Sequence, residues 1–350
     1  MALTTLPNAM LSFDGGSLIF RNRIINGDMR VDQRNAGAAV TTDGSYPVDR
    51  FRMNLSAGAG ISAQRSTAVV PTGFTHALGL TVTSTKTPAA ADQFDITHKV
   101  EGLNVADLAW GSASAQSITL SFWVRASVTG TYAVAVMNAA NNRSYVANYT
   151  VSASNTWEQK TITIAGDTTG TWVTTSADSG ITLRFDLGSG SNRNTTAGAW
   201  AAGNYTRTSG SVSLVSNSSA TLHVTGVQLE RGTVATPFER RPYSVELLLC
   251  QRYLRALKSG LVGFWASSTA VRLQCTWPGM RATPTFSQSG TLTVTDNSSN
   301  STQSSASVTD NGSDADGGQI IIGNVSGGTA NRVAAVLSSS AGSILVSAEL

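Results

Sequence analysis

Four aromatic residues stand in polar surroundings where their rings could stack on a sugar. Trp200 and Tyr205 belong to a long Gly, Ser, Asn and Thr stretch between residues 188 and 211. Trp110 precedes an alternating apolar segment in an Ala-Trp-Gly-Ser turn, and Trp123 falls on the polar side of that alternation. Pyranose rings present C–H faces and hydroxyl edges together, so exposed aromatic faces with a few fixed polar groups recognise them. We expect a glycan-binding surface at these residues, and packing beneath a loop is the alternative for each.

Catalytic signatures are missing from the sequence. It contains no Gly-x-Ser-x-Gly, no Walker loop and no Gly-x-Gly-x-x-Gly after a strand. The three histidines are far apart and indicate neither a zinc site nor a catalytic group: they are His76, His98 and His223. Acid pairs such as Asp92 with Asp95, or Asp314 with Asp316, could serve a glycosidase, but such pairs also arise by chance among 21 acidic residues. We therefore predict that the chain is not an enzyme.

The composition indicates a polar, weakly charged surface. Only 13% of residues are charged, and the net charge of +3 includes no basic cluster beyond Glu239-Arg-Arg241, which argues against nucleic acid as a partner. No run approaches the ~20 apolar residues of a membrane span, and no secretory signal is visible. Cys250 and Cys275 fit no metal-ligand pattern, and two separate buried thiols are favoured over a disulfide. A surface of this kind without an export signal is consistent with release by lysis, as virus particles are released.

Apolar and polar residues alternate through most of the chain, which predicts an all-β fold. From Ile118 to Arg125 every second residue is apolar, and the stretch Ala220–Glu230 repeats the pattern with a break at Thr225–Gly226, where we expect a β-bulge. Short strands at regular spacing predict a jelly-roll-like β-sandwich, with a barrel as the alternative. The expected strands are residues 60–66, 77–84, 93–101, 117–126, 130–138, 143–151, 157–164, 180–187 and 219–230.

One helix and a smaller β domain are expected to follow. Apolar residues recur at helical spacing from Tyr243 to Leu257, and Ser244 is the expected N-cap. Strands are expected beyond it at residues 261–266, 270–276, 283–287, 292–294, 320–323, 332–337 and 344–349. The predicted parts are an N-terminal arm (1–21), the sandwich (22–242), the connecting helix (243–258) and a C-terminal β domain (259–350). The last domain has a small core, which would gain stability from pairing with copies of itself.

Several stretches resemble a recurrent module in tail-fibre, tail-tip and other virion structural proteins of tailed bacteriophages. They are NRIINGDMRVDQRNAG, YPVDRF, VEGLNVADLAWGSASAQSITLSFWVRAS and VTGVQLERGTVATPFERRPYSVELLLCQRYL. The end motif is specific: it is Gln228-Leu-Glu-x-Gly with Thr236-Pro-Phe-Glu-x-Arg-Pro-Tyr243. The middle of the module resembles these proteins only in its general residue pattern.

The resemblance implies a structural subunit of a phage tail fibre or tail tip, located in the virion and homotrimeric. It also implies attachment to other virion proteins through the N-terminal arm and contact with a host cell-surface polysaccharide. A head-decoration fibre and a stand-alone carbohydrate-binding module are the alternatives that the sequence leaves open.

The two ends of the predicted sandwich are similar to those of jelly-roll carbohydrate-binding modules. This similarity implies that the terminal strands lie side by side and that acidic residues near them hold a structural calcium ion. Asn26, Asp28 and Glu230 would supply oxygen ligands, but Thr225-Gly226 stands where that family commonly carries an aspartate. A plain hydrogen-bonded turn at Asn26–Asp28 is favoured over bound calcium, and no other cofactor is expected.

Overall fold

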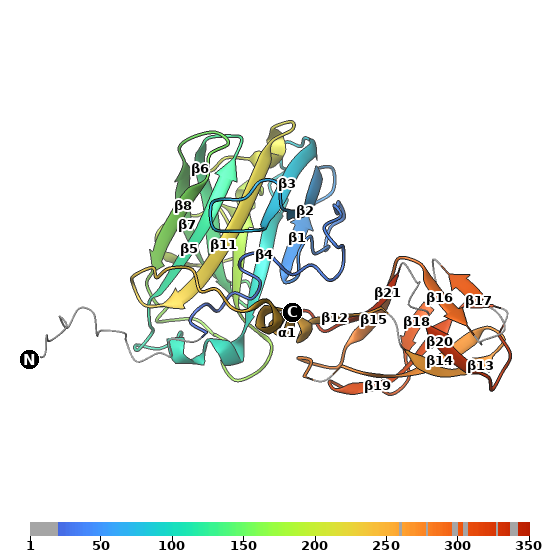
Figure 1. Cartoon of the computed structure of the whole chain (residues 1–350). Coiled ribbons are helices and arrows are strands. Elements are labelled where there is room, and N and C mark those ends of the chain that lie inside the picture. The colour runs from blue at the N-terminus through green and yellow to red at the C-terminus, as the bar shows by residue number, and fades with distance from the viewer. Residues whose placement is uncertain are drawn as a thin grey trace, which may run out of the picture. The chain divides into compact units, whose positions relative to one another are not determined.

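The structure is a computed structural model, and it describes residues 20–258, 261–277, 279–295, 300–303, 307–326, 328–336 and 342–350. The chain forms two compact units (Figure 1). The first contains the residues up to Met29, Thr41–Gly44 and Met53–Arg241, and the second contains Arg30–Val40, Ser45–Arg52 and Pro242–Leu350. Of the predicted N-terminal arm, only Phe20 and Arg21 belong to the described residues.

The first unit is a sandwich of two antiparallel sheets, as the alternation predicts (Figure 1). The six-stranded sheet has the order β1 (Phe51–Leu55), β4 (Phe94–Glu101), β9 (Ser179–Asp186), β6 (Gly130–Asn138), β7 (Arg143–Val151) and β10 (Trp200–Ala202). The five-stranded sheet has the order β2 (Gly60–Ser66), β3 (Ala77–Ser84), β11 (Thr221–Arg231), β5 (Ile118–Ala126) and β8 (Glu158–Ile164). The chain crosses repeatedly between the sheets, which is the connectivity of a jelly roll.

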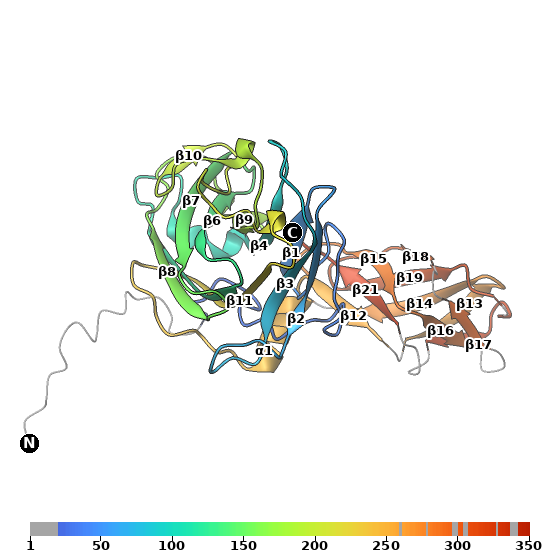
Figure 2. The ribbon, with the colours of Figure 1, turned by 90° about the horizontal axis from the view of Figure 1, so that it is seen from above.

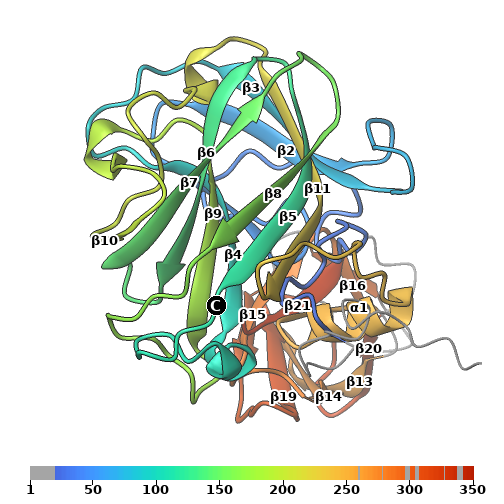
Figure 3. The ribbon, with the colours of Figure 1, turned by 90° about the vertical axis from the view of Figure 1, so that its left-hand side faces the viewer.

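The shared core of the sandwich lies between the two sheets. Phe122 projects from β5 and makes edge-to-face contacts with Tyr149 of β7 and Phe185 of β9, with ring centroids 5.1 Å apart in both pairs. Strands β5, β8 and β11 lie side by side in the five-stranded sheet (Figure 3). The pairing of β11 with β5 shifts register between Thr225 and Gln228, which confirms the predicted bulge.

Short elements complete the first unit. Four 3-10 helices occur within its described residues: η2 (Gly102–Asn104), η3 (Ala106–Leu108), η4 (Ser191–Arg193) and η5 (Leu214–Ser216). Strands β1 and β10 were not predicted. β10 has only three residues and forms one edge of the six-stranded sheet, where it pairs with β7 (Figure 2).

The predicted helix is correct only in its first half. Helix α1 spans Tyr243–Gln251, and its N-cap is Pro242 instead of Ser244, because the amides of Val245 and Glu246 donate to the Pro242 carbonyl. Residues Leu254–Leu257 form strand β12 and pair with β21 (Ser343–Ser347). The leucines are spaced as in a helix, but residues Leu254–Leu257 form a strand because their backbone pairs with that of β21.

The second unit is otherwise β-structure, so the all-β fold with one helix and a smaller C-terminal β domain is confirmed. A three-stranded sheet has the order β12, β21 and β15 (Thr285–Ser289). A seven-stranded sheet has the order β17 (Asn300–Gln303), β16 (Leu292–Thr295), β20 (Val333–Val336), β13 (Val262–Ser267), β14 (Ala270–Thr276), β19 (Gly317–Gly323) and β18 (Ser307–Asp310). Strands β12, β17 and β18 were not predicted.

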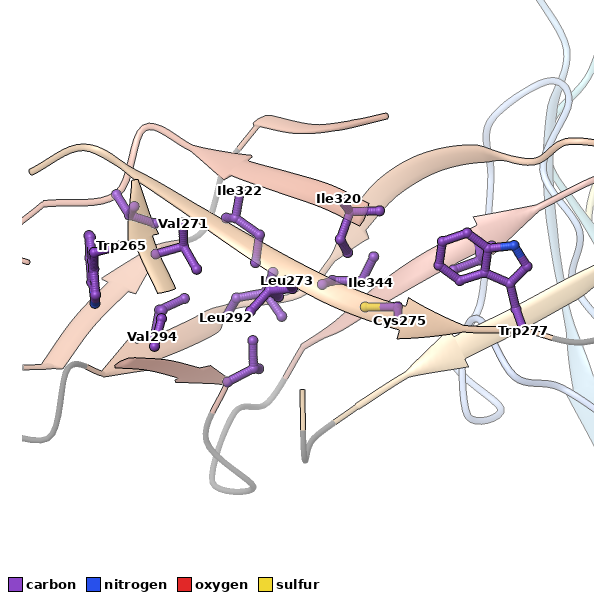
Figure 4. Close-up of a cluster of buried hydrophobic side chains, with 14 of the residues drawn as sticks. Trp265, Val271, Leu273, Cys275, Trp277, Leu292, Val294, Ile320, Ile322 and Ile344 are labelled. Atoms are coloured by element: carbon purple, nitrogen blue, oxygen red, sulfur yellow. The ribbon is translucent and has the colours of Figure 1, made fainter. Parts of the chain in front are cut away.

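The core of the second unit runs between two buried tryptophans. Figure 4 shows Leu273, Leu292 and Ile320 among the side chains gathered between Trp265 and Trp277. Cys275 belongs to this cluster, and Cys250 is buried in α1, so both cysteines are separate free thiols.

Two early segments belong to the second unit although the sequence assigned them to the sandwich. Arg34 donates to Glu349 near the C-terminus at 3.1 Å, and Arg50 pairs with the same carboxylate. The Arg50 guanidinium also stacks 3.4 Å from the centre of the Tyr253 ring. Buried charges require such partners, so these contacts tie Arg30–Val40 and Ser45–Arg52 to the C-terminal β-structure of the same unit.

Candidate functional site

Three tryptophans from separate parts of the sequence meet in the sandwich. Trp110 lies 4.6 Å from Trp172 and 5.2 Å from Trp200 between ring centroids, and Trp172 lies 5.4 Å from Trp200. All three pairs are edge-to-face, the arrangement that aromatic quadrupoles favour. The structure thus brings together Trp110 and Trp200, two of the four predicted glycan residues, and adds Trp172.

Strand pairing positions the exposed side of this cluster. Trp200 opens β10 and faces Tyr145 of β7 in the register, with their ring centroids 5.4 Å apart. Trp110 and Trp172 are buried, whereas Trp200 and Tyr145 are half-buried. We call Tyr145 and Trp200, with the two buried tryptophans behind them, the aromatic edge. The aromatic surface open to a ligand is therefore that of Tyr145 and Trp200.

A glycine allows the loops behind the aromatic edge to approach each other. Gly111 has φ +86°, in the region that favours glycine, and its amide donates to Asp167 O at 2.7 Å. A Cβ at this position would lie 2.9 Å from Gly170 O and would push the loops apart. The glycine next to Trp110 therefore permits the contact between Trp110 and Trp172.

Hydrogen bonds hold the three indoles in place. Trp200 Nε1 donates to Ala165 O at 2.8 Å, and Trp110 Nε1 donates to Gln116 O at 2.7 Å. Trp172 Nε1 lies 3.2 Å from Thr169 O and 3.3 Å from an Asp167 carboxylate oxygen. A ring fixed in this way loses little conformational entropy when it binds a ligand.

An ion pair lies beside the aromatic edge. Arg143 donates from Nε and Nη2 to the two carboxylate oxygens of Asp167, both at 2.7 Å. Burial acts to raise the pKa of Asp167, but hydrogen bonds from Arg143 and Thr169 outweigh it, so the pKa lies below its usual range. Arg143 lies two residues before Tyr145 on β7 and pairs with Ala202 of β10. A fixed charged group therefore accompanies the half-exposed rings, and this combination can stack on a sugar and hydrogen-bond to its hydroxyls.

Tyr205 lies elsewhere. Its ring packs on a small apolar cluster on the outer face of the six-stranded sheet, formed by Ala133, Ala135, Met137 and Val146. The long polar loop is anchored there by Asp186, whose carboxylate accepts from the amides of Gly188 and Ser189, each at 3.0 Å. The loop predicted to present Tyr205 thus folds back onto the sheet and separates Tyr205 from Trp200.

A buried polar network that the sequence did not indicate lies on the same outer face. Asn54 Nδ2 donates to Asp95 at 2.6 Å and to Thr97 at 2.7 Å, and Arg184 lies 3.7 Å from Asp95. Asp92 instead pairs with Lys86 at 2.8 Å. Asp92 and Asp95 therefore have different partners and do not form a carboxylate pair with each other. The alternation of β4 and β9, which places charged residues opposite the core face, is the pattern from which this network could have been predicted.

Trp123 lies on the outer face of the five-stranded sheet. It is half-buried and stands opposite Thr225 of β11 and Gln159 of β8. The bulge that Gly226 forms is next to it, since a Cβ on Gly226 would lie 3.1 Å from Trp123 Cδ1. The four predicted aromatic residues therefore divide among three places, and a glycan role for Trp123 stays a prediction.

The two ends of the sandwich lie side by side, as the resemblance implies. Arg23 N donates to Leu229 O and Val227 N donates to Gly27 O, both at 2.9 Å. Asn22 bridges them, because its Nδ2 donates to Val227 O at 3.0 Å and its Oδ1 accepts from the Leu229 amide at 3.0 Å.

The specific end motif holds the entering chain. Glu239 accepts from the amides of Phe20 at 2.6 Å and Asn22 at 2.7 Å, and Arg241 donates to the carbonyls of Asn22 and Ile24. We call Asn22, Glu239 and Arg241 the clasp. Its side chains contact backbone groups of residues 20–24 and of β11, so we assign it a structural role.

Of the calcium ligands that the resemblance implies, Glu230 is engaged in hydrogen bonds and Asn26 in a turn. Glu230 accepts at 2.8 Å from the Thr236 amide, at 2.7 Å from the Thr236 hydroxyl and at 2.9 Å from Gln228 Nε2, so donors occupy both of its oxygens. Asn26 has φ +61° and its carbonyl accepts from Met29 N at 2.9 Å, which is the predicted turn that contains Asp28. In the described part of the chain, no group of three His, Cys, Asp or Glu residues could hold a metal. Calcium binding stays a prediction from the resemblance.

Other residues that the sequence analysis considered for catalysis or metal binding lie in buried positions or turns. His98 is buried and its Nε2 lies 3.1 Å from Ile25 O. Burial, with Arg125 nearby, lowers the pKa of His223 to about 4. Asp314 accepts from the amides of Asp316 and Gly317, as a turn residue does. No helix in the described ranges is long and apolar enough to cross a membrane.

Comparison with protein-family models and with curated proteins gave no match. Solved structures similar to the chain include the enzymatically active domain of bacteriophage CBA120 tailspike protein 4, with a TM-score of 0.32 and 9% identity over 61% of this chain and 22% of that one. The family 11 carbohydrate-binding module of the Clostridium thermocellum cellulase Lic26A-Cel5E gives a TM-score of 0.29 and 12% identity over 58% of this chain and 100% of that one. TmCBM61 in complex with beta-1,4-galactotriose gives a TM-score of 0.32 and 11% identity over 61% of this chain and 99% of that one. These TM-scores are too low to support an argument beyond the similarity itself.

Proposed function

We propose that the chain is a structural subunit of a phage tail fibre or tail tip, located in the virion, that binds a host cell-surface polysaccharide at the aromatic edge. The observation that supports the binding role is the half-exposed pair of Tyr145 and Trp200, held by two buried tryptophans and accompanied by the Arg143–Asp167 ion pair. The resemblance of the end motif supports the particle role. The chain binds and does not catalyse.

The chemistry of the aromatic edge favours a neutral or acidic sugar. Stacking on Tyr145 and Trp200 would remove a C–H face of the sugar from water, and the Arg143 guanidinium would donate to hydroxyl or carboxylate oxygens. One small site of this kind binds weakly. Several linked copies raise the effective concentration and give useful avidity, which is the role we assign to the proposed homotrimer.

A glycan array followed by calorimetry on the best polysaccharide fragment tests the binding role. We expect Trp200→Ala to weaken binding at least ~10-fold, a loss of about 1.4 kcal/mol. Because Trp200 also contacts three rings, Tyr145→Ala serves as a second variant with fewer packing contacts. Trp157→Ala is the matched control, since Trp157 is a half-buried tryptophan that contacts His223 of the five-stranded sheet. Unchanged binding by both aromatic-edge variants, with thermal unfolding showing folded proteins, would contradict the assignment.

The stand-alone carbohydrate-binding module is the alternative function, and the head-decoration fibre differs only in its attachment. Immunogold labelling of the parent particle separates all three. Label on the tail supports the proposed function, label on the head supports decoration, and a glycan-binding chain absent from particles supports the stand-alone module.

A further inference from the structure

Asp167 is a buried carboxylate that accepts several of the hydrogen bonds of the aromatic edge. Its side chain is 1% exposed, whereas that of Arg143 is 19% exposed. Its Oδ1 accepts from Arg143 Nη2 at 2.7 Å and from the Thr169 amide at 3.3 Å, and its Oδ2 accepts from Arg143 Nε at 2.7 Å. Trp172 Nε1 lies 3.3 Å from the same Oδ2. Because Asp167 is buried and both of its oxygens are engaged, a ligand at the edge meets Arg143 and not Asp167.

The loop that carries Asp167 also holds one ring and the stem of Arg143. Ala165 O accepts from Trp200 Nε1 at 2.8 Å. Gly170 has φ +79°, and a Cβ there would lie 3.3 Å from Arg143 Cγ, so the loop lies against the aliphatic part of this arginine. The same loop therefore fixes an indole and a guanidinium relative to each other.

Arg143 points to the same side of the six-stranded sheet as Tyr145. The two residues are separated by one position on β7, and side chains of a strand alternate between its two faces. Nε and Nη2 of Arg143 donate to Asp167. Nη1 is accessible and has no hydrogen-bond partner in the part of the chain that the structure describes. Nη1 is therefore the nitrogen that can donate to a sugar beside Tyr145 and Trp200.

The Arg143–Asp167 pair carries no net charge. Hydrogen bonds to Asp167 raise the pKa of Arg143. Burial acts to raise the pKa of Asp167, but the hydrogen bonds from Arg143 hold it below its usual range, so both groups are ionised at neutral pH and their charges cancel. A ligand carboxylate at Nη1 would lose its water, would meet no uncompensated positive charge, and would lie near the like charge of Asp167. A ligand hydroxyl accepts the same hydrogen bond without these costs.

We propose that Asp167 sets the ligand preference of the aromatic edge: it neutralises Arg143 and holds the guanidinium beside Tyr145, so that the edge selects neutral sugars over sugars that carry a carboxylate. Asp167 is a positioning residue, because it acts through Arg143 and does not touch the sugar. The inference rests on the proposed function and decides between the two sugar classes that the proposed function leaves open. Both classes can stack on the rings, so the discrimination depends on the charge beside them.

Calorimetry on matched acidic and neutral probes tests the proposal at neutral pH. The probes are oligosaccharides of galacturonate and of glucuronate, each as the free acid and as the methyl ester, and wild type should prefer the ester. Asp167→Asn should raise the ratio of acid affinity to ester affinity at least ~5-fold, because a ligand carboxylate then gains a charge-assisted hydrogen bond from Arg143. Arg143→Gln should lower this ratio, and the double variant should restore it.

The ratio separates a charge effect from a general loss of binding, since a merely structural role of Asp167 would weaken both probes equally. Asp92→Asn is the matched control. It also frees a cation of the first unit, Lys86, which lies 2.8 Å from Asp92. Asp92 precedes β4, and three strands separate β4 from β10 in the sheet. We expect the wild-type ratio in this variant.

A measurement without sugar distinguishes failure of this inference from failure of the proposed function. Sodium acetate is the probe, sodium chloride at equal concentration is the reference, and NMR follows the indole N–H signals of Trp172 and Trp200, whose dispersion also shows that the variants are folded. Acetate should shift these signals in Asp167→Asn and not in wild type or the double variant, since only Asp167→Asn leaves Arg143 without a carboxylate.

Equal shifts in the three proteins, including no shift in any of them, overturn the proposal, and so does an unchanged acid-to-ester ratio in Asp167→Asn. If wild type binds no sugar but acetate shifts the signals of Asp167→Asn alone, the proposed function fails, whereas neutralisation of Arg143 by Asp167 is supported.

Discussion

Replacing Asn22 by alanine removes the side chain that joins the two ends of the sandwich. Asn22 is buried, and its amide makes three hydrogen bonds with backbone groups. Nδ2 donates to Val227 O at 3.0 Å, and Oδ1 accepts from Ile24 N at 2.9 Å and from Leu229 N at 3.0 Å. Alanine would leave one buried carbonyl and two buried amides without these partners.

The size of the effect follows from those three groups. A buried donor or acceptor that loses its partner costs about 1–3 kcal/mol, so three of them cost about 3–9 kcal/mol if they stay dry. Whole domains are stable by about 5–15 kcal/mol. We therefore expect Asn22→Ala to remove a large fraction of the stability of the first unit and to leave the second unit folded.

Native-state hydrogen exchange measures both units in one sample. The amides of β11, which include that of Leu229, should exchange faster by a factor that corresponds to at least about 2 kcal/mol. Amides of β14 in the second unit serve as the internal reference. Asn217→Ala is the matched control, since Asn217 is exposed and its side-chain Nδ2 donates to Ser213 O at 2.7 Å. If Asn22→Ala and Asn217→Ala changed the β11 exchange equally, the reasoning about the clasp would be refuted.

Three further predictions follow from buried groups. Burial raises the pKa of both Asp49 and Asp186 to about 6, above the ~3.9 of an unfolded chain. The folded state therefore binds more protons between those values, and the free energy of unfolding should fall by about 1–3 kcal/mol per group as pH rises from 4 to 6 and then level off. Urea unfolding at pH 5 and pH 7 checks this. Asp186→Asn should flatten the dependence of unfolding free energy on pH in the first unit alone. Gly226→Ala should destabilise that unit by about 1–3 kcal/mol, because φ is +62° and the new Cβ would lie 2.7 Å from an aromatic ring; an unchanged melting temperature would contradict this. Burial raises the pKa of Cys275 to about 11 and that of Cys250 well above its usual value, so neither thiol should react with a thiol reagent at pH 8 until the chain is denatured.

Much of the fold could be predicted because alternation is a local signal. Every residue of β5 that the alternation assigns to the core is buried, and the break at Gly226 becomes a bulge. Elements that depend on distant partners were not predicted. Strand β10 has three residues and exists because β7 pairs with it, and β12 is a strand because β21 lies beside it. Periodicity in so few residues does not distinguish strand from loop or helix.

The candidate site was less predictable than the fold. Polar neighbours in the sequence indicated exposure for Trp110, Trp200 and Tyr205, but tertiary contacts decide which ring is open. Trp110 is buried behind Trp200, and Tyr205 packs on the outer face of the six-stranded sheet. Tyr145 reads as an ordinary strand residue, and only its register with Trp200 places it at the aromatic edge. Loop composition therefore indicates where a site can form and does not indicate which side chains form it.

The division between clasp and aromatic edge has a consequence for function. The residues that carry the specific resemblance hold the entering segment, residues 20–24, since Glu239 and Arg241 contact its backbone amides and carbonyls. The aromatic edge instead comes from the middle of the module, which resembles those proteins only in its general residue pattern; its residues are Tyr145 and Trp200, with Arg143 beside them. Backbone recognition does not depend on the side chains of the bound segment, so the clasp can stay the same while the edge changes. Substitutions at Tyr145 and Trp200 should therefore change which glycan is bound without changing the stability of the clasp.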